Sequence, residues 1–249
     1  MINNGFKIEE DLEKALNNSR FKNLSNNLKT LINQLFGNQN GSAKIQCRRT
    51  DNFIKPDLAI TCDGKTAFVS VKSGHAQCVH TENTQTFIRF LKSLNVTDET
   101  LKTILYFQYG DGTLDGTGEK RMNYHKTFNW LCDRIKKANS EFECKQDVVE
   151  KVLDRLLFQG VDITADCADY IYYGDVDFGI VVSKRQIFTH LRRKSWSFYE
   201  NLHIGPIMLK PHARYADHAI VSDDRRHQTM FYWPNFSADL EYIQKRYNF

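Results

Sequence analysis

Hydrophobic residues along this chain recur at helical spacing in some segments and at every second position in others. Leucines and isoleucines between residues 8 and 36 follow the helical spacing, which predicts two helices. Gly37 comes directly after them, at the position of a helix cap. Alternation with a period of two then predicts three strands, near residues 43–49, 57–62 and 66–72.

The rest of the chain mixes the same two patterns. Helical spacing returns near residues 82–94, 98–108, 121–138 and 145–159. Strand patterns follow near 170–173 and 178–182, and in a late pair at 204–210 and 227–233, before a terminal helix from about residue 237. Helices are thus interspersed with strands along the chain, as in an α/β protein.

One hairpin carries the candidate chemistry. Asp63-Gly64 is a typical two-residue turn and joins the second and third predicted strands. Asp57 stands at the head of the first of these strands, and Ser70 and Lys72 point to one face of the other. A lysine on a half-buried strand is costly unless its ammonium has a partner or a task. An aspartate that holds Mg²⁺, beside a lysine that polarises an attacking water, would supply that task.

These residues resemble the PD-(D/E)XK nuclease superfamily, which has the restriction-endonuclease-like fold. The resemblance implies a mixed central sheet flanked by helices. The resemblance implies that Asp57 and the Val71 carbonyl ligate Mg²⁺, for which Mn²⁺ could substitute, and that Lys72 activates the attacking water. Ser70 stands where the family normally has its second acid, as a polar neighbour of the lysine. The chain is more similar to a branch with Ser-x-Lys on the strand and the second acid displaced onto the following helix.

Two regions offer a replacement acid. Glu82 opens the predicted helix after the hairpin, where it would either swing back to the metal or stabilise the helix dipole. Its spacing from Lys72 is shorter than that branch leads one to expect. Many members of the superfamily also carry a glutamate on a helix before the sheet, and that helix here contains Glu9, Glu10 and Glu13. Among these we select Glu10, although solvated surface would also account for each of them.

Two histidines, His75 and His80, flank the predicted site. Either could bind a phosphate, relay a proton or have no role, and we take His80 as the candidate. Residues 110–118 are rich in Gly and Asp but lack the Lys-Ser/Thr of a P-loop and the terminal Glu of an EF-hand. We expect a flexible loop there.

Composition limits the class of protein. With 249 residues, 41% of them hydrophobic, the chain can bury a sizeable core in one large domain or two small ones. Its six cysteines show no CxxC spacing, so neither a zinc module nor a disulfide framework is indicated. It has no apolar N-terminal segment and no long apolar run, so we expect a cytoplasmic protein without a membrane span.

Positive charge is concentrated late in the chain. Between residues 184 and 227 nine Lys and Arg stand against four Asp and Glu, a net charge of +5, whereas the whole chain carries +4. Such a segment can neutralise DNA phosphates. We expect phosphate contacts from Arg192, Arg193 and Lys194, and contacts to base edges from Arg225, Arg226 and Gln228. For any single residue of the second group, a solvated strand end is the competing interpretation.

Together these observations divide the chain into a nuclease core (1–110), a helical insertion with returning strands (111–183) and a basic, β-containing recognition part (184–249), which could also form one continuous domain. The resemblance implies a Mg²⁺-dependent endodeoxyribonuclease that cuts double-stranded DNA, foremost a restriction endonuclease acting as a homodimer beside a companion methyltransferase. Two alternatives remain open. One is a structure-specific repair or recombination nuclease, and the other is a catalytically inactive nucleic-acid-binding module.

Overall fold

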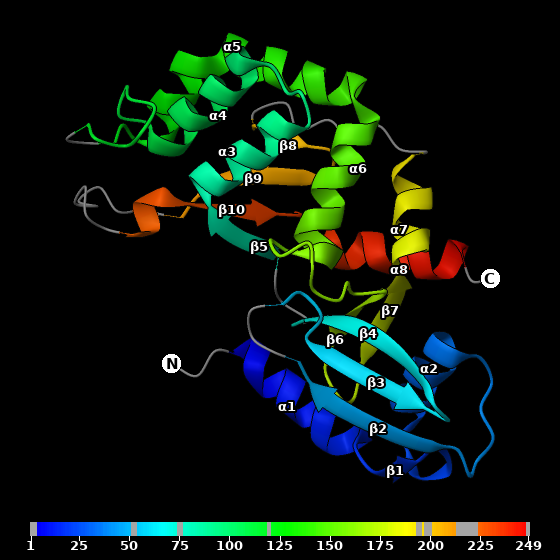
Figure 1. The fold of residues 1–249 in the computed structure, drawn as a ribbon. Coiled ribbons are helices and arrows are strands. Elements are labelled where there is room, and N and C mark those ends of the chain that lie inside the picture. Colours follow the sequence, from blue (N-terminus) through cyan, green and yellow to red (C-terminus); the bar gives the residue numbers. More distant parts are fainter. Residues whose placement is uncertain are drawn as a thin grey trace. The chain divides into compact units, whose positions relative to one another are not determined.

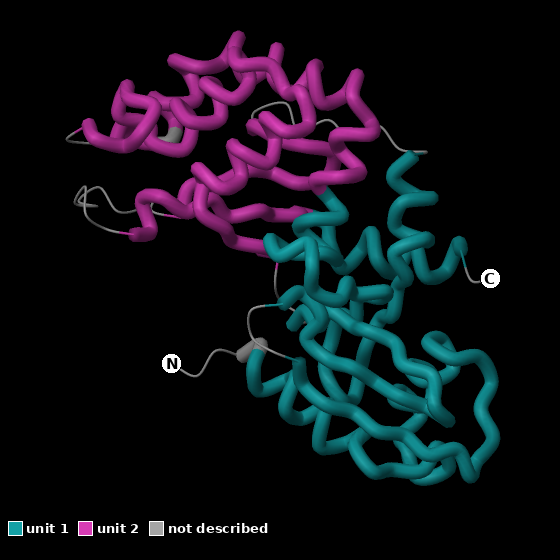
Figure 2. Tube along the Cα trace, in the orientation of Figure 1, with its two compact units in different colours: residues 1–76, 153–193, 235–249 teal, residues 77–152, 194–234 magenta. Residues whose placement is uncertain are grey.

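The chain forms two compact units. The computed structural model describes residues 4–50, 54–73, 77–118, 121–192, 196, 201–212 and 224–247. Unit 1 comprises residues 1–76, 153–193 and 235–249, and unit 2 comprises residues 77–152 and 194–234 (Figure 2). These boundaries differ from the three consecutive parts of the sequence analysis, because later strands return to the sheet that the first strands begin.

Unit 1 is built on a six-stranded mixed sheet with the order β1-β2-β3-β4-β6-β7 (Figure 1). Its strands are β1 (Ser19–Arg20), β2 (Lys44–Arg49), β3 (Leu58–Cys62), β4 (Lys65–Lys72), β6 (Tyr170–Gly174) and β7 (Gly179–Ser183). The β4–β6 pair is parallel and the other pairs are antiparallel. The mixed α/β sheet that the sequence predicts is confirmed.

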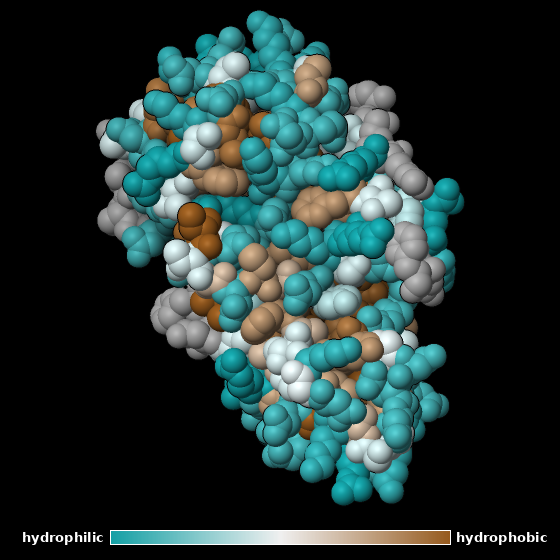
Figure 3. Space-filling view, turned by 45° about the vertical axis from the view of Figure 1, so that its right-hand side comes forward, coloured by the Kyte–Doolittle hydropathy of each residue, from teal (hydrophilic) through white to brown (hydrophobic). Residues whose placement is uncertain are grey.

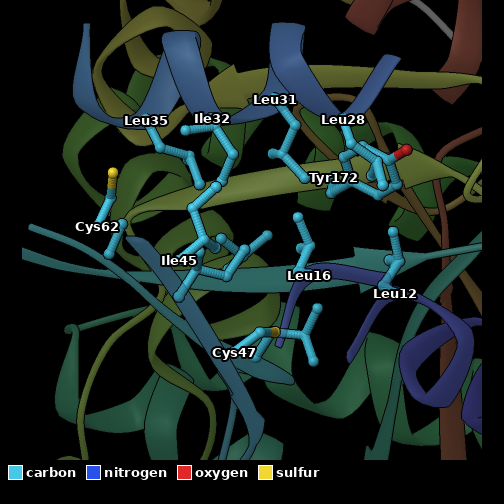
Figure 4. Close-up of a cluster of buried hydrophobic side chains, with 14 of the residues drawn as sticks. Leu12, Leu16, Leu28, Leu31, Ile32, Leu35, Ile45, Cys47, Cys62 and Tyr172 are labelled. Atoms are coloured by element: carbon cyan, nitrogen blue, oxygen red, sulfur yellow. The ribbon is translucent and has the colours of Figure 1, made fainter. Parts of the chain in front are cut away.

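Helices cover both sides of parts of this sheet. Leucines and isoleucines of α1 (Asn4–Leu16) and α2 (Asn26–Phe36) pack on one face, in a core with side chains of β2, β3 and β4 (Figure 4). On the other face, α8 (Phe236–Arg246) packs on β6, where the rings of Phe236 and Tyr173 are 5.5 Å apart. The helix α7 (Lys184–Leu191) contacts β7, and a 3-10 turn (Phe21–Asn23) follows β1.

The β3–β4 hairpin forms as its sequence predicts. Cys62 pairs with Lys65 across the turn. Asp63 and Gly64 both have positive φ, 46° and 84°, which is the requirement of a type I′ turn. This hairpin places the first residues of β3 beside the last residues of β4.

Unit 2 combines three helices with a four-stranded antiparallel sheet of order β5-β10-β9-β8. The helices are α3 (Thr84–Ser93), α4 (Asp98–Tyr109) and α5 (Tyr124–Cys144). The strands are β5 (Cys78–Asn83), β8 (His203–Ile204), β9 (Ile207–Pro211) and β10 (Gln228–Tyr232), and a 3-10 turn (Asp224–His227) precedes β10. The helix α6 (Gln146–Asp154) and its π-helical continuation (Arg155–Gln159) lead from unit 2 into unit 1.

Two expectations about element boundaries were wrong. The helix predicted from residue 82 begins at Thr84, because residues 78–83 pair with β10 and the Asn83 side chain caps the helix by accepting from the Thr86 amide. The strand predicted over 204–210 is divided into β8 and β9 by a turn at Gly205, which has a φ of +55°.

Hydrophilic residues predominate on the face seen in Figure 3. None of the helices in the described ranges is long and apolar enough to cross a bilayer. All six cysteines are free thiols.

Candidate active site

Asp57 and Lys72 come together where β3 begins and β4 ends. The Asp57 amide donates to the Val69 carbonyl at 2.9 Å, which fixes the aspartate beside β4. Its Oδ2 accepts from the Ser70 hydroxyl at 3.0 Å and from the Val71 amide at 2.5 Å. The Lys72 ammonium lies 3.7 Å from the same oxygen and donates to Ser70 Oγ at 2.9 Å and to the Val71 carbonyl at 3.0 Å.

Ser70 links the two charged groups. Ser70 is fully buried, whereas the Lys72 and Asp57 side chains are 15% and 23% exposed. The hydroxyl accepts from the lysine and donates to the aspartate. A carboxylate at this buried position would add a second negative charge that has to be desolvated. Serine therefore connects Lys72 to Asp57 without that cost.

A second carboxylate near Asp57 comes from α1. Burial, followed by repulsion from Asp57, raises the pKa of Glu9 to about 7, and the charges of Lys72 and Arg49 oppose this increase. Glu9 is therefore close enough to Asp57 and Lys72 for their charges to act on it. A repelling pair of acids beside a lysine is typical of functional sites.

The choice of Glu10 from the sequence does not fit the structure. Its carboxylate is 2.5 Å from the Lys14 ammonium on the exposed side of α1, and this hydrogen bond lowers the Glu10 pKa. The spacing in the sequence could have identified Glu9, which lies three residues before the fully buried Leu12 and thus on the inward side of the helix. Glu13 is bonded to Arg49, with 2.9 Å between Oε2 and Nε.

The oxygen atoms near Asp57 offer part of a metal site. Both hydrogen bonds that Asp57 accepts from the described residues use Oδ2, so Oδ1 is left to face a cation. Carboxylate oxygens of this kind suit Mg²⁺. Within the described ranges no group of three or more His, Cys, Asp or Glu side chains is placed to hold a metal ion. A magnesium ion that keeps several waters needs only one or two carboxylates, which Asp57 and Glu9 would supply.

Glu82 and His80 belong to the other unit of the chain. Both are on β5 of unit 2, whereas Asp57 and Lys72 belong to unit 1. The Glu82 side chain is 3% exposed, and its Oε2 lies 3.3 Å from His80 Nε2. Glu82 belongs to β5 and precedes the helix, so the first-turn position predicted for it is wrong. His75 falls outside the described residues.

The residues expected to contact DNA differ in their exposure to solvent. Arg192 and Arg225 are exposed, and Arg193 and Lys194 lie outside the described residues. Gln228 Oε1 is 2.9 Å from His212 Nδ1. The Arg226 guanidinium is only 4% exposed and lies 2.7 Å from Asp111, so its placement does not fit a side chain that reads base edges. This pair instead anchors the Gly/Asp-rich segment, because Arg226 also donates to the Gly118 carbonyl at 2.6 Å.

Comparison with known proteins identifies the fold. No family model matches the chain, and no curated protein is similar to it. Among solved structures, the restriction endonuclease MspI in complex with its cognate DNA is similar, with a TM-score of 0.53 and 11% sequence identity. The likeness covers 90% of this chain and 82% of that one. This chain therefore has a restriction-endonuclease-like fold. At this identity the likeness describes the fold alone.

Proposed function

We propose that this protein is a Mg²⁺-dependent endodeoxyribonuclease that cuts double-stranded DNA, foremost as a restriction endonuclease. The observation that supports this proposal most directly is the arrangement of Asp57, Ser70 and Lys72 at the end of the β3–β4 hairpin. The fold also supports the proposal, because the solved structure that is similar to this chain is a restriction endonuclease bound to its cognate DNA.

The proposed chemistry assigns each side chain a task. Lys72 orients and polarises a water for attack on the phosphorus, and its ammonium is kept in place by Ser70 and the Val71 carbonyl. Asp57 and Glu9, with the Val71 carbonyl, would hold the metal. Bound there, Mg²⁺ would act as a Lewis acid that stabilises the charge developing on the phosphate oxygens. By the family resemblance, cleavage leaves a 5′-phosphate.

The direct test is digestion of unmethylated phage DNA with Mg²⁺, and with Mn²⁺ in parallel. Discrete fragments that are absent with Lys72→Ala would support a sequence-specific endonuclease, and mapping their ends would give the recognition site. Cleavage only of branched or damaged DNA would favour a repair or recombination enzyme. Binding without any cleavage would reverse the proposal in favour of an inactive module, an alternative motivated by Ser70 in place of an acid.

A homodimer forms part of this proposal. Each chain carries one Asp57–Lys72 site, and one site cuts one strand, so a double-strand break needs two chains or two successive events. Light scattering with and without a DNA duplex would distinguish these cases. A companion methyltransferase is expected if the enzyme restricts foreign DNA, and methylated phage DNA should then resist digestion.

A further inference from the structure

One half of the sheet in unit 1 has an uncovered face. On β2, Lys44, Gln46 and Arg48 are exposed, and they alternate with the buried Ile45 and Cys47 of the core. The helices α1 and α2 pack on the buried face, and α8 packs on β6 and β7 at the other end of the sheet. The exposed side chains of β2 therefore form an open surface on the sheet side that faces away from the core, beside the partly exposed Thr61 of β3.

This surface shares its side of the sheet with the catalytic lysine. Arg48 pairs with Ala59 of β3, and Ala59 pairs with Phe68 of β4. Phe68 alternates with Ser70 and Lys72, so all three point to the same side. Arg48 thus lies two strands away from Phe68, or about 10 Å at the usual strand spacing. Arg48 therefore lies on the same side of the sheet as Lys72.

Three cations on this face have no partner among the residues that the structure describes. Arg20, Lys44 and Arg48 are exposed, and Arg20 pairs with Lys44 across β1 and β2. None of their side chains makes an ion pair or hydrogen bond with another residue in the part of the chain that the structure describes. Lys44 and Arg48 are four residues apart, which corresponds to about 13 Å along the strand.

Two nearby acids accept hydrogen bonds from backbone amides and make none with the side chains of these cations. Asp63 accepts from the Lys44 amide at 3.2 Å, and Asp169 accepts from the Phe68 amide at 3.1 Å. Glu13 is paired with Arg49 at the edge of β2. The polar groups between the cations are neutral: Gln46 is exposed, and the Thr61 and Thr66 hydroxyls lie 2.8 Å from each other.

A row of cations that have no partner in the described part of the chain is complementary to a row of phosphates. We propose that this open face, formed by Arg20, Lys44, Gln46, Arg48, Thr61 and Thr66, binds the sugar-phosphate backbone of duplex DNA next to the scissile phosphate. The proposal rests on the proposed nuclease function and extends it. The face supplies affinity and orientation, without reading sequence.

The test is the salt dependence of binding to a fluorescent DNA duplex, measured by anisotropy in EDTA so that no cleavage occurs. Each lost phosphate contact should reduce the slope of log K against log salt by about 0.9. Lys44→Gln/Arg48→Gln should therefore reduce it by between about 1 and 2. The matched control Lys29→Gln/Lys245→Gln removes the same charge from α2 and α8, and should retain the wild-type slope.

The outcomes separate this inference from the proposed function. If the wild type binds and cuts duplex DNA but both double variants have the wild-type slope, the open face does not contact phosphates and only this inference is overturned. If both slopes fall equally, the effect is one of net charge and the inference is likewise wrong. A reduced slope with single-stranded DNA or RNA, but not with the duplex, would assign the face to another ligand. If the wild type neither binds nor cuts duplex DNA, the proposed function falls as well.

Discussion

Lys72 is held by three neighbours that leave its ammonium little freedom. It lies near Asp57 and donates to Ser70 and to the Val71 carbonyl, with a side chain only 15% exposed. A cation in such a position is difficult to explain by solubility alone, because partial burial of an ammonium is costly. A role in polarising a water or a phosphate would explain why the protein keeps a partly buried ammonium at this position.

Lys72→Met tests that role. The substitution keeps the length of the side chain and removes the charge, so cleavage of duplex DNA should fall by about 100-fold or more, in the range of a lost acid–base group. Anisotropy should show nearly wild-type DNA affinity. Lys65→Met, at the exposed start of the same strand, is the matched control and should cut normally. Unchanged turnover in Lys72→Met would remove this site from the mechanism.

Glu9 should give the metal-free protein a distinctive pH dependence. Its pKa is about 7 in the folded protein against an ordinary value of 4.5, mainly because of burial and Asp57. Between these values the folded state holds a proton that the unfolded chain has lost, so stability falls as pH rises through this window. Glu9→Gln abolishes this effect, and its melting temperature should exceed that of the wild type at pH 8 but match it at pH 4.

Thermal melts in EDTA at both pH values would measure the difference. Glu10→Gln is the control from the neighbouring position, where Lys14 lowers the pKa of an exposed carboxyl. It should not reproduce the gain at pH 8. An equal change for Glu9→Gln at both pH values would show that the pKa of Glu9 is not raised in the folded protein.

The β3–β4 hairpin is the element that brings the site together, and its turn depends on backbone conformation. Gly64 has a φ of +84°, and a Cβ added there would meet nothing within 4 Å. Gly64→Ala should therefore cost roughly 1–2 kcal/mol through the left-handed backbone alone. Urea denaturation would measure this loss. Gly41→Ala, where a Cβ would make only an ordinary 3.5 Å contact with Lys22, should be close to neutral.

How far the sequence determines an element depends on the range of its interactions. The hairpin was predictable because Asp63-Gly64 and the alternation beside it are local signals. The strand β5 was missed because its residues are stabilised by pairing with β10, more than 140 positions later in the chain. Glu9 could have been chosen from its spacing to Leu12, whereas the exposed neighbour Glu10 looks equally acidic in the sequence. The burial of Arg226 against Asp111 follows from tertiary packing, which no local pattern carries.

At the scale of the whole molecule, two units with separate sheets share one chain that passes between them repeatedly. Each unit has its own stabilising centre. In unit 1 this centre is the apolar cluster between α1, α2 and the sheet. Unit 2 contains a buried ion pair, Arg226–Asp111, whose side chains are 4% and 0% exposed. Although burial opposes it, hydrogen bonding by Thr113 and Arg226 holds the pKa of Asp111 below its ordinary value.

Removing one partner of the Arg226–Asp111 pair should destabilise unit 2 and leave the stability of unit 1 unchanged. Arg226→Met leaves the Asp111 carboxylate buried without its guanidinium, which typically costs about 3–5 kcal/mol. Native-state hydrogen exchange should show faster exchange in α4 and β10 while the amides of β3 and β4 keep their protection, since local opening follows cooperative units. Arg225→Met, exposed in the same 3-10 turn, is the matched control and should change stability by less than about 0.5 kcal/mol. Equal loss of protection in β3 and β4 would instead mean that the two units unfold together, and that a change at Arg226 reaches the Asp57–Lys72 site through the stability of the whole molecule.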